Sequence, residues 1–131
     1  MLLIEKLVKK VLPITVYTDI LGAFALFAVS LLWWNVPVLT LVLLIIAGLL
    51  LYMRSGNQEI ALFVFCGIAG AVSETIGIFF GAWTYALPTA FQIPLWLPVL
   101  WGIAAVFTLR TYEQIEAFWK IREVKFLFRS S

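Results

Sequence analysis

Four long apolar stretches constrain the fold of this chain more than any other feature. They run over about 14–34, 36–53, 60–83 and 94–112, and each approaches the roughly 20 helical residues that cross about 30 Å of hydrocarbon. The 131 residues are 64% hydrophobic and 12% charged, which is more apolar surface than so small a globule can hide from water. The chain is therefore predicted to be all-α: one polytopic integral-membrane domain over 1–131, with four transmembrane helices.

Polar or proline-containing segments separate these stretches. Asn35 and Pro37 lie between the first and second, RSGNQE (54–59) forms a polar turn, and TYALPTAFQIP (84–94) forms an uncharged loop. The chain has no histidine and a single cysteine, which excludes an intrachain disulfide, a Cys/His metal cluster and a histidine general base. We therefore expect no metal and no cofactor.

The basic residues orient the predicted bundle. With four spans, all nine Lys and Arg residues fall on one side of the membrane: Lys6, Lys9, Lys10, Arg54, Arg110, Lys120, Arg122, Lys125 and Arg129. Basic loops are retained in the cytoplasm, so both termini are predicted to be cytoplasmic and the protein to lie in the inner membrane. Membrane lipids are the expected partners of this basic side, and no nucleic-acid partner is expected.

Both ends of the chain are amphipathic. Segments 2–13 and 112–128 mix basic and apolar residues at helical spacing. This pattern is typical of helices that lie on an anionic leaflet, and we prefer that interpretation for both segments. The alternative for 112–128 is a docking helix for a partner protein.

Glu74 is an isolated carboxylate within the third apolar stretch. At about 1.5 Å per residue it lies roughly 13 Å below the outer boundary, where desolvation favours the protonated form. At about 100° per residue it shares a narrow arc of the helix with glycines at 67, 70, 77 and 81. Two interpretations fit: a seam for close helix packing, or a groove in which a ligand lies beside the acid. The expected hydrogen-bond donors to Glu74 are Ser73, Thr75 and Trp101.

A second buried acid, Asp19, is predicted close to the inner end of the first span. Arg110 lies at a similar depth in the fourth span. Two charges that cannot easily leave lipid are expected to satisfy one another, so Asp19 and Arg110 are predicted to form a structural ion pair.

Aromatic residues are dense between the third and fourth spans. They are predicted to wall an apolar pocket over the candidate acid Glu74, together with the glycines of the stripe. The proposed ligand-binding residues are Gly70, Gly77, Gly81, Trp83, Tyr85, Trp96 and Trp101. An ordinary belt of interfacial aromatics is the alternative, and it explains Trp101 less well because that residue lies deeper.

A resemblance to known proteins rests on Glu74, Gly77 and two segments, GAWTY (81–85) and IPLWLPVLWG (93–102). They resemble an uncharacterised family of small four-helix bacterial inner-membrane proteins whose fourth span has a P-x-W-x-x-x-L-W pattern. The order of Glu, Gly, aromatic, Pro and Trp is more remotely similar to membrane enzymes of carotenoid biosynthesis, the hydratase and lycopene-cyclase-like proteins. That similarity implies that Glu74 protonates an isoprenoid double bond while aromatic faces stabilise the carbocation.

Three function classes fit these features. The first is an intramembrane protein that binds or processes a lipid or isoprenoid, with Glu74 as its buried acid. The second is a small proton-coupled transporter that works as a homodimer. The third is a non-catalytic membrane subunit or assembly factor whose glycine stripe receives a helix of a partner membrane protein.

Overall fold

Four helices make up the fold. The computed structural model describes residues 2–54 and 56–129, and this part of the chain is all-α, without strands, as predicted. The helices are α1 (Leu2–Leu32), α2 (Val36–Tyr52), α3 (Asn57–Phe79) and α4 (Leu97–Arg129).

Two of the helices are longer than the spans predicted from the sequence. The amphipathic segment 2–13 continues into the apolar part of α1, with Pro13 inside the helix, and 112–128 likewise belongs to α4. The predicted span limits at 14 and 112 therefore do not mark helix ends, because a change in side-chain polarity does not interrupt backbone hydrogen bonding. The loop between α3 and α4 is longer than predicted, and α4 begins at Leu97 with Pro98 in its first turn, where a missing N–H is tolerated.

Local signals set the other boundaries. The Oδ1 atom of Asn35 accepts a hydrogen bond from the backbone N–H of Val38 (3.3 Å) and so caps the start of α2. Gly81 follows the end of α3 with a φ of +77°, a conformation that favours glycine. The backbone N–H of Ala82 then donates to the Gly77 carbonyl at 2.9 Å, which closes the end of the helix.

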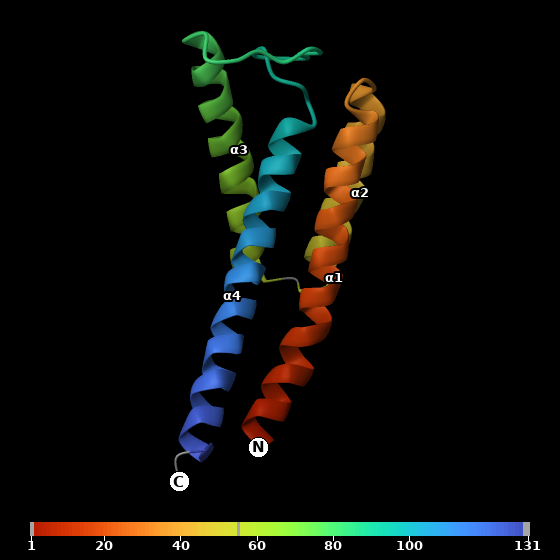
Figure 1. The fold of residues 1–131 in the computed structure, drawn as a ribbon. Helices are drawn as coiled ribbons and strands as arrows, with labels where there is room; N and C mark the ends of the chain where they lie inside the picture. The colour runs from red at the N-terminus through yellow and green to blue at the C-terminus, as the bar shows by residue number, and fades with distance from the viewer. Residues whose placement is uncertain (1, 55, 130–131) are drawn as a thin grey trace.

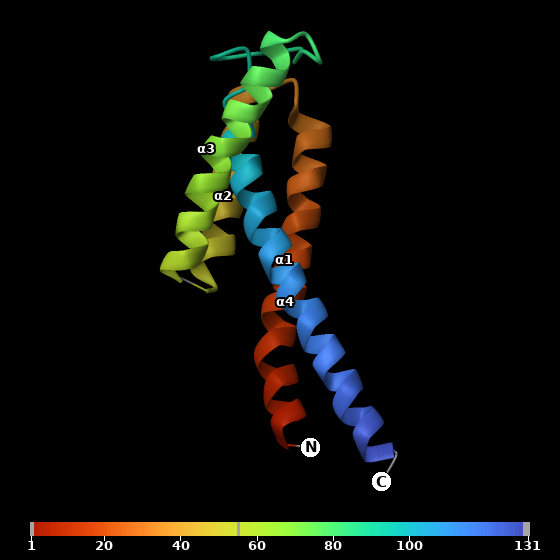
Figure 2. The same cartoon turned by 90° about the vertical axis from the view of Figure 1, so that its left-hand side faces the viewer.

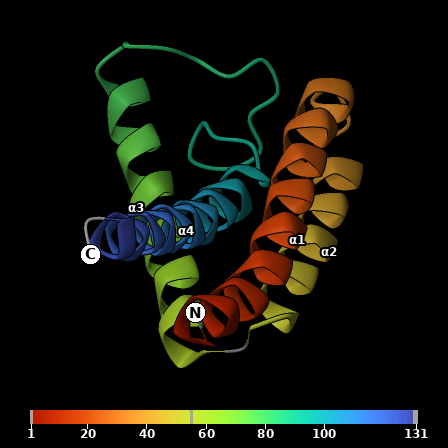
Figure 3. The same cartoon turned by 60° about the horizontal axis from the view of Figure 1, so that its bottom comes forward.

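The long helix α4 lies between α3 and the α1–α2 pair (Figure 3). Close approach to α3 depends on glycine, because a Cβ at Gly67 would lie 2.9 Å from the Pro98 carbonyl oxygen. The side chains of Leu39, Leu43 and Val106 are fully buried between α2 and its neighbours.

The two ends of the molecule differ in the segments that form them. The start of α1 and the end of α4 lie at one end, and the loop between α3 and α4 lies at the other (Figure 1). The turn between α2 and α3 lies partway along the molecule, so the first part of α1 and the last part of α4 extend beyond it (Figure 2).

Two of the described helices, α1 and α3, are long and apolar enough to cross a membrane. The helix α2 is apolar but has only 17 residues. The apolar part of α4 ends at Arg110.

Candidate functional site

A cavity of about 320 Å³ lies between the C-terminal part of α3, the following loop and the start of α4. We call it the Glu74 cavity. Its lining consists of one acid, three aromatic residues and three aliphatic ones: Glu74, Tyr85, Trp96, Leu97, Leu100, Trp101 and Ala104. The structure thus brings four of the residues singled out in the sequence to one cavity.

Glu74 is held by two neutral donors from the loop. Its Oε2 atom accepts a hydrogen bond from Trp83 Nε1 at 2.8 Å and another from the Tyr85 hydroxyl at 3.0 Å. These are not the expected donors, since Ser73 and Thr75 bond back to the carbonyls of their own helix at Ala69 and Ala71. Hydroxyls in helices commonly do this, so the chain supplies donors to Glu74 from the loop instead.

The glycine stripe supports aromatic rings. The ring of Trp101 occupies the space that a Cβ would need at Gly70, and the ring of Trp83 does the same at Gly77. The predicted ligand-binding glycines therefore differ in role. Gly70 and Gly77 are covered by rings that lie at or beside the cavity, whereas a Cβ at Gly81 would have nothing within 4 Å, and this glycine serves the turn.

Tyr85 stays protonated well above neutral pH. Burial is the main cause, and the hydrogen bond to Glu74 and the charge of that carboxylate add to it; together they raise the pKa of Tyr85 to about 12. A phenol with this pKa is a donor at neutral pH. Tyr85 can therefore donate a hydrogen bond to Glu74 throughout the physiological range.

Trp96 carries a buried N–H without an acceptor. The residue is 7% exposed, and within the described part of the chain no hydrogen-bond partner reaches its Nε1 atom. Its ring packs at 89° against Tyr85, with 6.3 Å between the ring centroids. Buried indole N–H groups are usually paired, and this one is an exception within the described part of the chain.

A second polar group, which we call the Arg110 cluster, joins all four helices. Arg110 is 3% exposed, and its Nε and Nη2 atoms bond the two carboxylate oxygens of Glu59 at 3.1 and 2.8 Å. The same guanidinium donates to Thr18 Oγ1 of α1 at 3.1 Å and to the Leu50 carbonyl of α2 at 2.7 Å. Arg54 completes the cluster by bonding Glu59 and Glu113.

This arrangement corrects the predicted pair of Asp19 and Arg110. Asp19 is exposed on α1, whereas the preceding residue, Thr18, faces Arg110. Successive helical residues point about 100° apart, so only one of the two can face the bundle. Glu59 was not singled out from the sequence because it stands in a polar segment that resembles an ordinary turn. Its place at the start of an apolar helix, facing a buried arginine, was the available signal.

Comparison with protein-family models, with curated proteins and with solved structures finds no match to this chain.

Proposed function

We propose that this chain is an integral membrane protein that crosses the bilayer four times, with both termini in the cytoplasm, and binds an amphipathic ligand of the lipid or isoprenoid class in the Glu74 cavity. The observation that carries the proposal is that Glu74 lines a cavity together with the aromatic side chains of Tyr85, Trp96 and Trp101. A few polar groups converging in an apolar pocket are typical of ligand sites.

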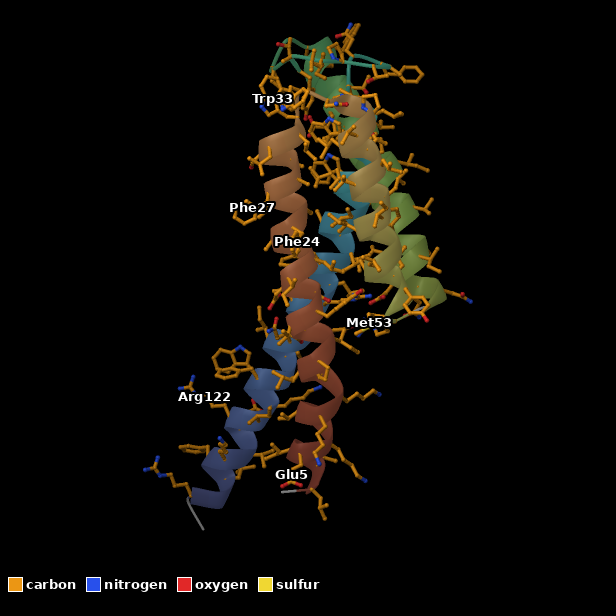
Figure 4. The ribbon with its side chains drawn as sticks, turned by 90° about the vertical axis from the view of Figure 1, so that its right-hand side faces the viewer. Glu5, Phe24, Phe27, Trp33, Met53 and Arg122 are labelled. Carbon is orange, nitrogen blue, oxygen red and sulfur yellow. The ribbon has the colours of Figure 1, made fainter. Side chains whose placement is uncertain are left out.

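The apolar exterior supports the membrane setting. Large side chains such as Phe24, Leu26 and Phe27 of α1 are 62–70% exposed, and Phe27 points away from the bundle (Figure 4). Comparable positions are exposed along α2 and α3. Soluble monomers rarely expose contiguous apolar surface on this scale, whereas lipid accommodates it.

The distribution of charge supports four spans and the orientation. No charged residue occurs over 20–53, and Glu74 is the only one over 60–109. The 17 residues of α2 extend about 26 Å at 1.5 Å per residue, which is slightly shorter than a typical hydrocarbon core. The basic residues lie towards the start of α1 and the end of α4 or at the α2–α3 turn, as retained cytoplasmic segments require.

The geometry of Glu74 favours binding over proton donation. Two donors converge on one carboxylate oxygen, an arrangement that stabilises an acceptor rather than an acid about to release its proton. The glycine stripe is also covered within the chain, at Gly70 by Trp101 and at Gly67 by the Pro98 carbonyl. These contacts favour a ligand site over a seam that receives a partner helix.

Filling the cavity tests this function. Ala104 lines the cavity with an exposed side chain, so Ala104→Trp should occupy it without disturbing the core. Ala61→Trp is the matched control, because Ala61 is equally exposed on α3 and lies away from the cavity. Mass spectrometry of the purified proteins should find a co-purifying amphiphile with wild type and Ala61→Trp and not with Ala104→Trp. Equal recovery from all three proteins would contradict the proposal.

A further inference from the structure

We infer that the polar end of the ligand in the Glu74 cavity carries an organic ammonium group, of the quaternary type found in choline. The inference rests on the proposed function, since it specifies the chemistry of the ligand for the same cavity. Two observations lead to it: the charge of the cavity and the composition of its walls.

The cavity holds an acid without a counter-ion. Glu74 is the only charged residue over 60–109, and the residues that bond it, Trp83 and Tyr85, are both neutral. Both bonds are made to Oε2, and within the described part of the chain no hydrogen bond to Oε1 is found. A carboxylate in an apolar setting is stabilised strongly by a cation, and since the lining contains no basic residue, the ligand is the natural source of that positive charge.

The walls of the cavity suit a cation that has lost its water. Tyr85 and Trp96 stand at right angles to each other, and Trp101 adds a third ring to the lining. Aromatic faces attract cations through their quadrupoles, most strongly when the cation is desolvated, and cages of several rings recognise quaternary ammonium groups. A primary ammonium would need several hydrogen-bond acceptors, and the lining offers few besides Glu74.

The remaining lining residues fit the rest of such an amphiphile. Leu97, Leu100 and Ala104 follow one another along α4 and provide an apolar path for an alkyl chain. A choline lipid carries a phosphate next to the cation, and a free alkylammonium does not. The two sources of the ammonium group can therefore be distinguished by probes with and without the phosphate.

Calorimetric titration of the full chain in uncharged maltoside micelles tests the inference. The probes are dodecyltrimethylammonium, its neutral isostere with carbon in place of nitrogen, and dodecylphosphocholine. Wild type should bind the ammonium probe at least about tenfold more tightly than the isostere, which corresponds to about 1.4 kcal/mol. Glu74→Gln should remove most of this preference. Asp19→Asn, which removes an exposed carboxylate on α1, should keep it.

The phosphocholine probe identifies the source of the cation. Tighter binding of dodecylphosphocholine than of dodecyltrimethylammonium would assign a lipid headgroup. Equal binding of the two probes, with the ammonium preference intact, would assign a free organic cation. Both results support an ammonium ligand.

Two further outcomes separate failure of this inference from failure of the proposed function. If the neutral isostere binds wild type as tightly as the ammonium probe, and Ala104→Trp abolishes both, the cavity binds amphiphiles and the ammonium inference is wrong. If Ala104→Trp leaves the binding of every probe unchanged, the cavity is not the site and the proposed function is wrong as well.

Discussion

The helix α3 carries two acids in contrasting environments. Glu59, in its first turn, is 3% exposed and is bonded by the guanidinium groups of both Arg54 and Arg110. Glu74, near the other end, is only partly buried and is bonded by the neutral donors Trp83 and Tyr85. The chain supplies positively charged partners to Glu59 and only neutral partners to Glu74.

This contrast separates a structural role from a binding role. Burial of a charge is tolerated when partners of opposite sign and full hydrogen bonding accompany it, and the Arg110 cluster meets both conditions with groups from all four helices. The Glu74 cavity does not meet the first, because its donors are neutral. A site that supplies hydrogen bonds without a counter-charge leaves the counter-charge to a ligand, and we attribute ligand binding to Glu74 for that reason.

The largest effect is expected from breaking the Arg110 cluster. Arg110→Met should lower the free energy of unfolding by about 3–5 kcal/mol, because it leaves Glu59 buried without its main partner. The double variant Arg110→Met with Glu59→Met should recover part of the loss, since two apolar side chains replace an ion pair. Unfolding by a denaturing detergent in mixed micelles measures both.

Asp19→Asn is the matched control for this prediction. The side chain is exposed, so its removal should change the free energy of unfolding by no more than the roughly 0.5 kcal/mol typical of surface substitutions. A loss comparable to that of Arg110→Met would restore Asp19 as the partner of Arg110.

A smaller effect is expected where Trp101 rests on Gly70. Gly70→Ala should displace the ring and destabilise the fold by about 1–3 kcal/mol, the usual cost of overpacking. Gly48→Ala, in α2, is the matched control because nothing lies within 4 Å of a Cβ there; it should stabilise the helix by about 0.5–1 kcal/mol. The same unfolding titration applies. Equal effects of the two substitutions would show that Trp101 does not depend on Gly70.

The smallest effect concerns the ionisation of Tyr85. Since its pKa in the folded protein is raised to about 12, the unfolded chain releases this proton at a lower pH, near 10. Tyr85 therefore contributes stability that is complete below about pH 10 and is lost as the pH rises towards 12. The phenolate absorbance, followed through an alkaline pH titration of wild type and of Tyr85→Phe, measures the pKa of Tyr85 directly.

The same titration of Glu74→Gln tests how much Glu74 contributes to the raised pKa of Tyr85. Burial is the larger cause of the raised pKa, so Tyr85 should still ionise above pH 10 in this variant, but below its wild-type value. An unchanged pKa would mean that the charge of Glu74 does not act on Tyr85 in solution.

The sequence predicted the Glu74 cavity better than the Arg110 cluster. Glu74, Tyr85, Trp96 and Trp101 could be grouped because the end of α3, the following loop and the start of α4 are consecutive in sequence. The partner of Arg110 could not be chosen correctly, because it depends on which side of α1 faces α4 and on contacts across 51 residues of sequence. Thr18 and Asp19 are adjacent in sequence, and only packing decides between them.

The sequence also predicted only some of the helix ends. The sequence marks the start of α2 at Asn35 and the end of α3 at Gly81 through capping and turn chemistry. It gives no such signal near Pro13 or Tyr112, where the helices continue through a change in polarity.

The most direct test compares neutralisation of the two acids of α3. Glu74→Gln should change the free energy of unfolding by less than about 1 kcal/mol, because the amide oxygen still accepts hydrogen bonds from Trp83 and Tyr85. Glu59→Gln should lower it by about 3–5 kcal/mol, because Arg54 and Arg110 lose their shared counter-ion. Unfolding both variants by the same detergent titration gives the answer. Equal losses in the two variants would contradict the assignment of Glu59 to structure and Glu74 to binding.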